Sequence, residues 1–247
     1  MRIENSFIPV SGVGERTERK LWRAGVTTWD DFDGSVVGST TADRIESFID
    51  TARSHLEEGN ARYFGEQFPS GSQWRLYENF AENTCFLDIE TTGLDHDHDD
   101  VTVVGLHRGG ETEALVRGRD LTRERLRSEL DAAEMLVTFN GKRFDVPFLE
   151  TSFDLAIDVP HLDLMYPCRQ LGLTGGLKEI EQRVGIDRDR PDLSGRDAVR
   201  LWREYERGDD EALETLVSYN RDDTANMERL VETVTTRLHE DVFVTPE

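Results

Sequence analysis

The stretch Phe86-Leu87-Asp88-Ile89-Glu90-Thr91-Thr92-Gly93-Leu94 places two acids between apolar residues at alternating positions. Side chains alternate between the two faces of a strand, so Asp88 and Glu90 would share one face while Leu87 and Ile89 occupy the other. Adjacent carboxylates repel each other unless a cation lies between them, and a hard divalent cation with oxygen ligands suits such a pair. In so acidic a chain an Asp-x-Glu pair also arises by chance. The prediction of a cation site therefore depends on the position of this pair at the end of a strand.

The sequence around this strand predicts a sheet with strands in both directions. Three strands follow one another before the first helix, and further strands then alternate with helices, which is typical of a mixed α/β sheet. The predicted strands are residues 84–90, 101–107, 112–116, 135–139 and 161–164. The predicted helices are residues 122–133, a helix from about residue 146, and a mostly helical segment from residue 177 to about 239 with breaks near 185–195 and 208.

A second acidic motif, Asn140-Gly141-Lys142-Arg143-Phe144-Asp145, directly follows the predicted strand 135–139. Loops after the carboxyl ends of strands are where α/β sheets bind ligands, which makes Asp145 a candidate site residue. Asp145 could equally be the N-cap of the next helix, with Pro147 in the first turn. The two interpretations are compatible, because a capping carboxylate keeps a free oxygen.

A third motif, Tyr219-Asn220-Arg221-Asp222-Asp223, lies in the C-terminal helical segment. Tyr219 and Asp223 are four residues apart and therefore stack on one helix face, whereas Asp222 falls outside it. The same face is otherwise apolar and includes Leu216, Met227, Leu230 and Val234. Burial of an unpaired carboxylate costs several kcal/mol, so Asp223 should meet a cation or strong donors. The alternative is a partly exposed acid at the end of the apolar stripe.

Together and in this order, the three motifs resemble the DnaQ-like, RNase H-fold 3′→5′ exonucleases, which are named for four acids. The matching positions are Asp88, Glu90, Asp145 and Asp223. One branch of the family has a histidine five residues before the last acid, where this chain has Ser218, and the other has a tyrosine four residues before it, where this chain has Tyr219. The chain therefore resembles the tyrosine branch. The resemblance covers about residues 84–236, and residues 162–164, 175–181 and 219–220 are similar to the YprB-like group.

This resemblance implies two-metal hydrolysis of phosphodiester bonds at the 3′ end of single-stranded DNA or RNA, with Mg²⁺ or Mn²⁺ as cofactors. It implies that Asp88, Glu90 and Asp223 hold one cation and that Asp88 and Asp145 frame the second. Tyr219 would orient the attacking water, because a hydroxyl with an unperturbed pKa of about 10 is a weak base. The residues that would contact the terminal nucleotide or the nearby loop are Thr91, Thr92, Gly93, Leu94 and Asn140.

Residues 1–80 are predicted to form a small helical domain and residues 81–247 the RNase H-like domain. Predicted helices follow Gly14, surround Trp29 after a threonine cap, and span residues 39–57. The segment 10–17 resembles a helix-hairpin-helix element, whose glycines and helix start approach phosphate. Its candidate nucleic-acid-binding residues are Gly12, Gly14, Arg16 and Lys20. A purely structural turn is the alternative.

Charge is the strongest signal in the composition. The 247 residues include 51 acidic and 29 basic ones, for a net charge of −22, and only three of the basic residues are lysines. This bias indicates adaptation to a salt-filled cytoplasm, where a Debye length of about 3 Å at 1 M salt screens the self-repulsion. The alternative is a generic acidic protein. No apolar run approaches the ~18 residues of a membrane span, and the first residues lack the apolar segment of a signal peptide, so a cytoplasmic protein is expected.

Three functions remain open at this point. The leading one is a 3′→5′ exonuclease, and the second is a structure-specific endonuclease of the same fold. The third is a non-catalytic nucleic-acid-binding module with a nuclease-like fold. Cations among the four acids would favour catalysis, whereas carboxylates paired with arginine would favour the binding module.

Overall fold

The computed structural model describes residues 1–188 and 192–243. The chain forms two compact units. The first contains Met1–Ala81 and the residues from Val234 onward, and the second contains Glu82–Thr233. Each unit has buried hydrophobic residues of its own, so we describe each by itself.

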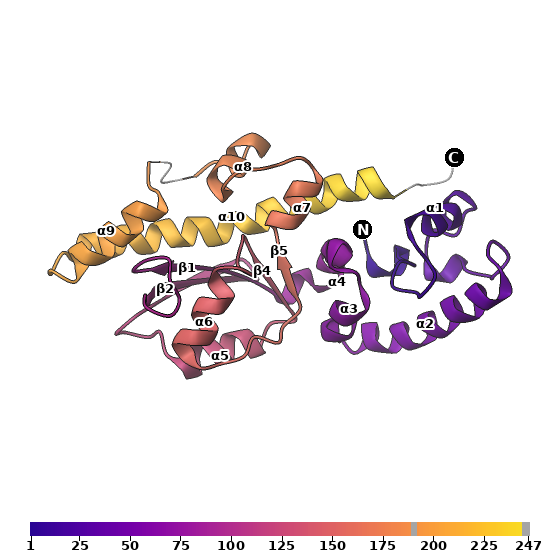
Figure 1. Cartoon of the computed structure of the whole chain (residues 1–247), viewed down its shortest axis with the longest axis horizontal. Helices are drawn as coiled ribbons and strands as arrows, with labels where there is room; N and C mark the ends of the chain where they lie inside the picture. The colour runs from indigo at the N-terminus through magenta and orange to yellow at the C-terminus, as the bar shows by residue number, and fades with distance from the viewer. Residues whose placement is uncertain (189–191, 244–247) are drawn as a thin grey trace. The chain divides into compact units, whose positions relative to one another are not determined.

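The second unit is built on a five-stranded mixed sheet with the strand order β3-β2-β1-β4-β5 (Figure 1). Its strands are β1 (Thr84–Thr91), β2 (Val101–Arg108), β3 (Glu111–Val116), β4 (Met135–Thr138) and β5 (His161–Asp163). The first three strands are antiparallel, whereas β4 is parallel to β1 and β5 is parallel to β4. The predicted mixed α/β sheet is thus confirmed, and the predicted strands agree with the observed ones to within a residue at each end.

Helices cover both faces of this sheet (Figure 1). The helices from α5 onward are α5 (Arg123–Asp131), α6 (Asp145–Phe153), α7 (Met165–Gln170), α8 (Leu177–Val184), α9 (Gly195–Tyr205) and α10 (Asp210–Val242). One core joins the sheet to α5 and α6, and a second core joins the opposite face to α9 and α10. Within the described ranges, no helix is both long enough and apolar enough to cross a membrane.

The alternation along β1 decides which side chains face which layer. Leu87 and Ile89 lie in the core shared with α5 and α6, so Asp88 and Glu90 point to the opposite face, toward α9 and α10. The pairing of β1 with β2 is regular from Phe86 to Glu90 and shifts in register between Glu90 and Thr91. This irregularity ends the strand at the point where the predicted site begins.

The first unit is helical. It contains η1 (Ile3–Asn5), α1 (Glu15–Arg23), η2 (Trp29–Asp31), α2 (Ser39–Glu57), α3 (Ala61–Gln67), η3 (Ser70–Leu76), α4 (Tyr77–Phe80) and η4 (Ala81–Asn83), the last of which runs into the second unit. An ion pair of 2.9 Å between Glu18 and Arg75 is buried at its centre, and Glu18 also accepts hydrogen bonds from the backbone N–H groups of Phe7 and Ile8. These bonds satisfy a buried carboxylate and fix the segment that precedes the Gly12–Gly14 turn.

Candidate active site

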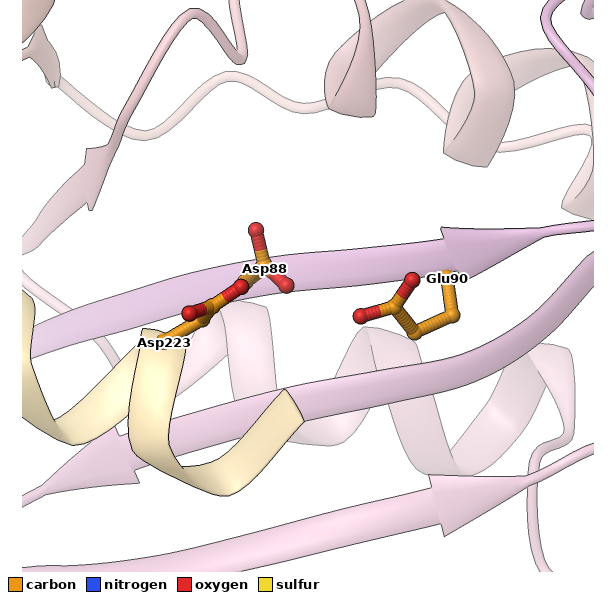
Figure 2. A group of neighbouring side chains, drawn as sticks. All are labelled: Asp88, Glu90 and Asp223. Carbon is orange, nitrogen blue, oxygen red and sulfur yellow. The ribbon is translucent and has the colours of Figure 1, made fainter. Parts of the chain in front are cut away.

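Three carboxylates meet where β1 and α10 face each other. One oxygen from each of Asp88, Glu90 and Asp223 lies within 4.8 Å of the other two. Figure 2 shows Asp88 and Glu90 extending from the same strand, with Asp223 reaching toward them from the helix. Glu90 and Asp223 are each only 7% exposed, and Asp88 is partly exposed. Asp223 thus lies on the buried face of its helix, and the alternative of an exposed acid at the end of the stripe is wrong.

Asp145 is close to this cluster but is not one of its three members. It is the first residue of α6, 4% exposed, and its negative charge raises the pKa of Glu90. The alternative role predicted for it, as the helix N-cap, is wrong: the N-cap is Phe144, and Asp145 already has helical geometry. An acid in the first turn is still favoured by the helix dipole, which accounts for its place there without a cap.

The electrostatics of the cluster favour a bound cation. Burial raises the pKa of Asp88 to about 7. Burial, followed by the charges of neighbouring acids, raises the pKa values of Glu90 and Asp145 well above their ordinary ranges. Buried carboxylates that repel one another are stabilised by a divalent cation, and carboxylate oxygens are the ligands that Mg²⁺ and Mn²⁺ prefer. The donor set therefore fits a hard divalent ion.

A pocket of about 360 Å³ opens over these acids. Its volume lies within the range of roughly 300–1,000 Å³ that is usual for ligand sites. Tyr219, one turn before Asp223, lines the pocket, and burial raises the pKa of its hydroxyl, which therefore stays protonated. The other wall is formed by the start of α9, where Arg196 and Val199 lie.

The strand ends supply most of the predicted substrate-contacting residues. The pocket is lined by Thr91, Gly93, Leu94 and Asn140, and Leu94 is 85% exposed. Thr92 does not line it. Its hydroxyl instead donates to Asp99 at 3.3 Å and accepts from the backbone N–H of Asp100 at 2.9 Å. Thr92 thus fixes the following loop, and its contact with substrate stays a prediction.

The loop after β4 is held by Asp163, which is 1% exposed. Its carboxylate accepts from the backbone N–H groups of Asn140, Lys142 and Met165 at 2.8 to 3.2 Å. Asn140 has φ of +65°, a conformation that asparagine adopts more readily than most residues. Asp163 therefore fixes the loop that leads from β4 to Asp145.

Arg188 is a member of the site that the sequence did not predict. Its guanidinium is 3% exposed, forms ion pairs with both Glu181 and Asp223, and lies 5.7 Å from the centre of the Tyr219 ring. It follows α8 in an irregular segment, and nothing in the spacing of the acidic motifs points to it. Glu181 and Asp223 thus share one buried cation, which compensates charges that would otherwise be unpaired.

The remaining predicted residues belong to the first unit. Gly12 has φ of +91°, which favours glycine, and Gly14 is the N-cap of α1. Arg16 and Lys20 are exposed on α1, and the Lys20 ammonium donates to the backbone carbonyl of Val36 at 2.6 Å. None of these four residues lines the pocket over the acids.

Comparison with a family model agrees with the architecture. A sequence model of the RNase H superfamily matches residues 85–235. Among solved structures, a nuclease in its apo form is 22% identical, with 66% of this chain and 78% of that chain covered and a TM-score of 0.47. NrnC from Brucella melitensis is 18% identical (67% and 77% covered, TM-score 0.46). The family B DNA polymerase of Pyrobaculum calidifontis is 19% identical (64% and 24% covered, TM-score 0.47). No curated protein matches the sequence.

Proposed function

The chain belongs to the RNase H superfamily, and from this premise we propose that it is a metal-dependent 3′→5′ exonuclease of the tyrosine branch. The observation that carries the proposal is the convergence of Asp88, Glu90 and Asp223, whose oxygens lie within 4.8 Å of one another. In the proposed enzyme these three residues hold one divalent cation, and Asp88 and Asp145 hold a second. The substrate is single-stranded DNA or RNA with a free 3′ end.

Mg²⁺ or Mn²⁺ held by these acids would lower the pKa of a water and would stabilise the leaving oxygen. The protein supplies orientation. Tyr219 lines the pocket beside Asp223, and its protonated hydroxyl positions the water by hydrogen bonding. Removal of one such positioning group typically costs ~10- to 1,000-fold in rate.

In the proposed enzyme the pocket receives one terminal nucleotide. Leu94, which is exposed and lines the pocket, would pack against the terminal base, and the backbone of Thr91 and Gly93 would contact the nucleotide. Asn140 also lines the pocket, at the loop held by Asp163. A pocket filled by the end of the strand favours removal of nucleotides one at a time over cutting within a strand.

The ion pair between Arg188 and Asp223 favours a second candidate, the non-catalytic nucleic-acid-binding module. In that protein the arginine takes the place of a cation and keeps Asp223 neutralised. The two candidates differ in a measurable way, because the binding module holds an oligonucleotide in EDTA and never shortens it.

We also propose that the first unit contacts the nucleic-acid backbone through the Gly12–Gly14 turn. Arg16 and Lys20 follow this turn on α1 and are exposed. Backbone N–H groups at a helix start, together with nearby cations, attract phosphate. This contact concerns binding alone, since none of these residues lines the carboxylate pocket.

The test is hydrolysis of single-stranded DNA and RNA with Mn²⁺ in multimolar KCl. Linear strands with a 5′ label are compared with circular strands labelled internally, and Asp223→Ala is compared with Asp222→Ala, the matched loss of the neighbouring acid. We expect a ladder that shortens one nucleotide at a time on linear substrate, absent in Asp223→Ala and nearly unchanged in Asp222→Ala. Cutting of circles would support the endonuclease, and intact strands that remain bound would support the binding module.

A further inference from the structure

Asn220 is the residue beside Asp88 that the proposed chemistry leaves unexplained. It lies on α10 between Tyr219 and Asp223 and is completely buried. Its side-chain amide donates to the Asp88 carboxylate at 2.9 Å and to the Asp88 backbone carbonyl at 3.3 Å. One side chain therefore fixes both the carboxylate and the strand that carries it, across a separation of 132 residues.

Gly105 provides the space for this contact. It lies on β2 directly opposite Asp88 in the antiparallel register. A Cβ atom at Gly105 would overlap the Asn220 Oδ1 and Thr224 Oγ1 atoms. Glycine inside a strand is destabilising relative to alanine, and the close approach of α10 to β2 explains its presence here.

The chemistry of the donor matters as much as its position. An amide is neutral, so it orients the Asp88 carboxylate without cancelling its charge, whereas a lysine or arginine in the same place would cancel it. The bond occupies the Oδ2 atom of Asp88 and restricts rotation of the carboxylate, so Oδ1 keeps a defined direction. Donors behind a metal ligand typically change metal affinity by ~10- to 100-fold when they are removed.

We propose that Asn220 is a positioning residue that orients the Asp88 carboxylate for cation binding. The absence of a side chain at Gly105 leaves the space that Asn220 needs. This inference rests on the proposed function insofar as it concerns the same cation site. The quantity that it predicts is the affinity for the metal ion, however, and this affinity can be measured without any substrate.

The experiment compares Asn220→Leu and Asn220→Ser with Thr224→Val. Leucine is similar in size but cannot donate, and serine is too short to reach Asp88, so two variants with different packing both remove the two hydrogen bonds from the Asn220 amide to Asp88. Thr224 is equally buried and also contacts the space at Gly105, but its hydroxyl donates to the Asn220 backbone carbonyl at 2.7 Å and not to Asp88. It therefore controls for packing at this helix–strand contact.

Calorimetric titration of metal-free protein with Mn²⁺ is the first measurement, with circular dichroism as the check of folding. We expect the Kd for Mn²⁺ to rise ~10- to 100-fold in both Asn220 variants and to change less than about twofold in Thr224→Val. Hydrolysis by the Asn220 variants should recover as the Mn²⁺ concentration is raised, which a merely structural defect would not do.

Wild-type Mn²⁺ affinity in a folded Asn220→Leu or Asn220→Ser variant would overturn the inference, and so would an equal loss in Thr224→Val. The same measurements test the proposed function independently. If the wild type binds Mn²⁺ but shortens no strand, the proposed exonuclease activity is wrong, and the Mn²⁺ affinities of the variants still decide the role of Asn220. If the wild type shortens strands and the Asn220 variants match it at every Mn²⁺ concentration, only the inference falls.

Discussion

The carboxylate cluster should destabilise the metal-free protein, and Asp88→Asn should relieve that cost. Burial raises the pKa of Asp88 to about 7, from an ordinary value of 3.8. The folded chain therefore binds this proton more tightly than the unfolded chain does. It follows that the free energy of unfolding decreases as the pH rises from about 4 to about 7, and that the loss is complete above that range.

The size of the effect follows from the difference between the two pKa values. That difference is about 3, and each unit corresponds to roughly 1.36 kcal/mol, which gives ~4 kcal/mol at pH 8. Asp88 is partly exposed, and solvent screening reduces the value, so we expect ~2 kcal/mol. For a chain of this size, 1 kcal/mol shifts the Tm by about 2–4 °C, so Asp88→Asn should raise it by ~4–8 °C.

The assay is thermal unfolding in EDTA at pH 8 and pH 4, with Glu214→Gln as the control that removes one charge from an exposed position of α10. The amide oxygen introduced by Asp88→Asn can still accept the hydrogen bond from Asn220, so packing is preserved. The gain in Tm should be present at pH 8, nearly absent at pH 4, and absent in the control. With Mn²⁺ added, the wild type should gain more stability than Asp88→Asn, because a ligand stabilises the state that binds it. An Asp88→Asn protein that is no more stable than the wild type at pH 8 would refute this reasoning.

Three further perturbations test other parts of the structure. Tyr219→Phe should slow hydrolysis ~10- to 1,000-fold with little change in Mn²⁺ affinity; an unchanged kcat would show that the tyrosine has a packing role only. Asp163→Asn should lower the Tm and raise KM, because an amide oxygen cannot replace a carboxylate that accepts from three backbone N–H groups. The expected loss of stability is about 1–3 kcal/mol for each donor left unsatisfied. A wild-type KM would show that this loop does not contribute to substrate binding. Charge reversal at Arg16 and Lys20, together with Arg19 on the same helix α1, should raise KM without changing kcat, as measured over a series of salt concentrations. An unchanged KM would show that the N-terminal turn has a packing role only.

Local patterns in the sequence were sufficient to predict the strands of the sheet and to locate the three acidic motifs. Alternation predicted that Asp88 and Glu90 share a face, and the core at Leu87 and Ile89 confirms it. The helical stripe predicted that Asp223 is buried, and its exposure of 7% agrees. These predictions depend on side-chain periodicity, which is a property of a strand or helix by itself.

Helices α3 and α4 and the 3₁₀ helix η3 were not predicted. They are short, and together they cover residues 61–80 with few residues between them. A short helix gains little from propensity, so its formation depends on the packing of an apolar face against neighbours that the sequence does not place. The N-cap at Phe144 in place of Asp145 has a similar origin, because the loop is held by Asp163 from another strand.

The contacts that make the acids into a site were decided by the tertiary structure alone. Asn220 reaches Asp88 across 132 residues, and it can do so only because β2 presents Gly105 where α10 approaches the sheet. Arg188 meets Asp223 from an irregular segment whose path no periodicity describes. The sequence by itself determined which residues carry charge and on which face of their own element they lie. The distances between those charges, and therefore their pKa values and their capacity to bind a cation, depend on how strand and helix pack, because burial and Coulomb interactions act through space and not along the chain.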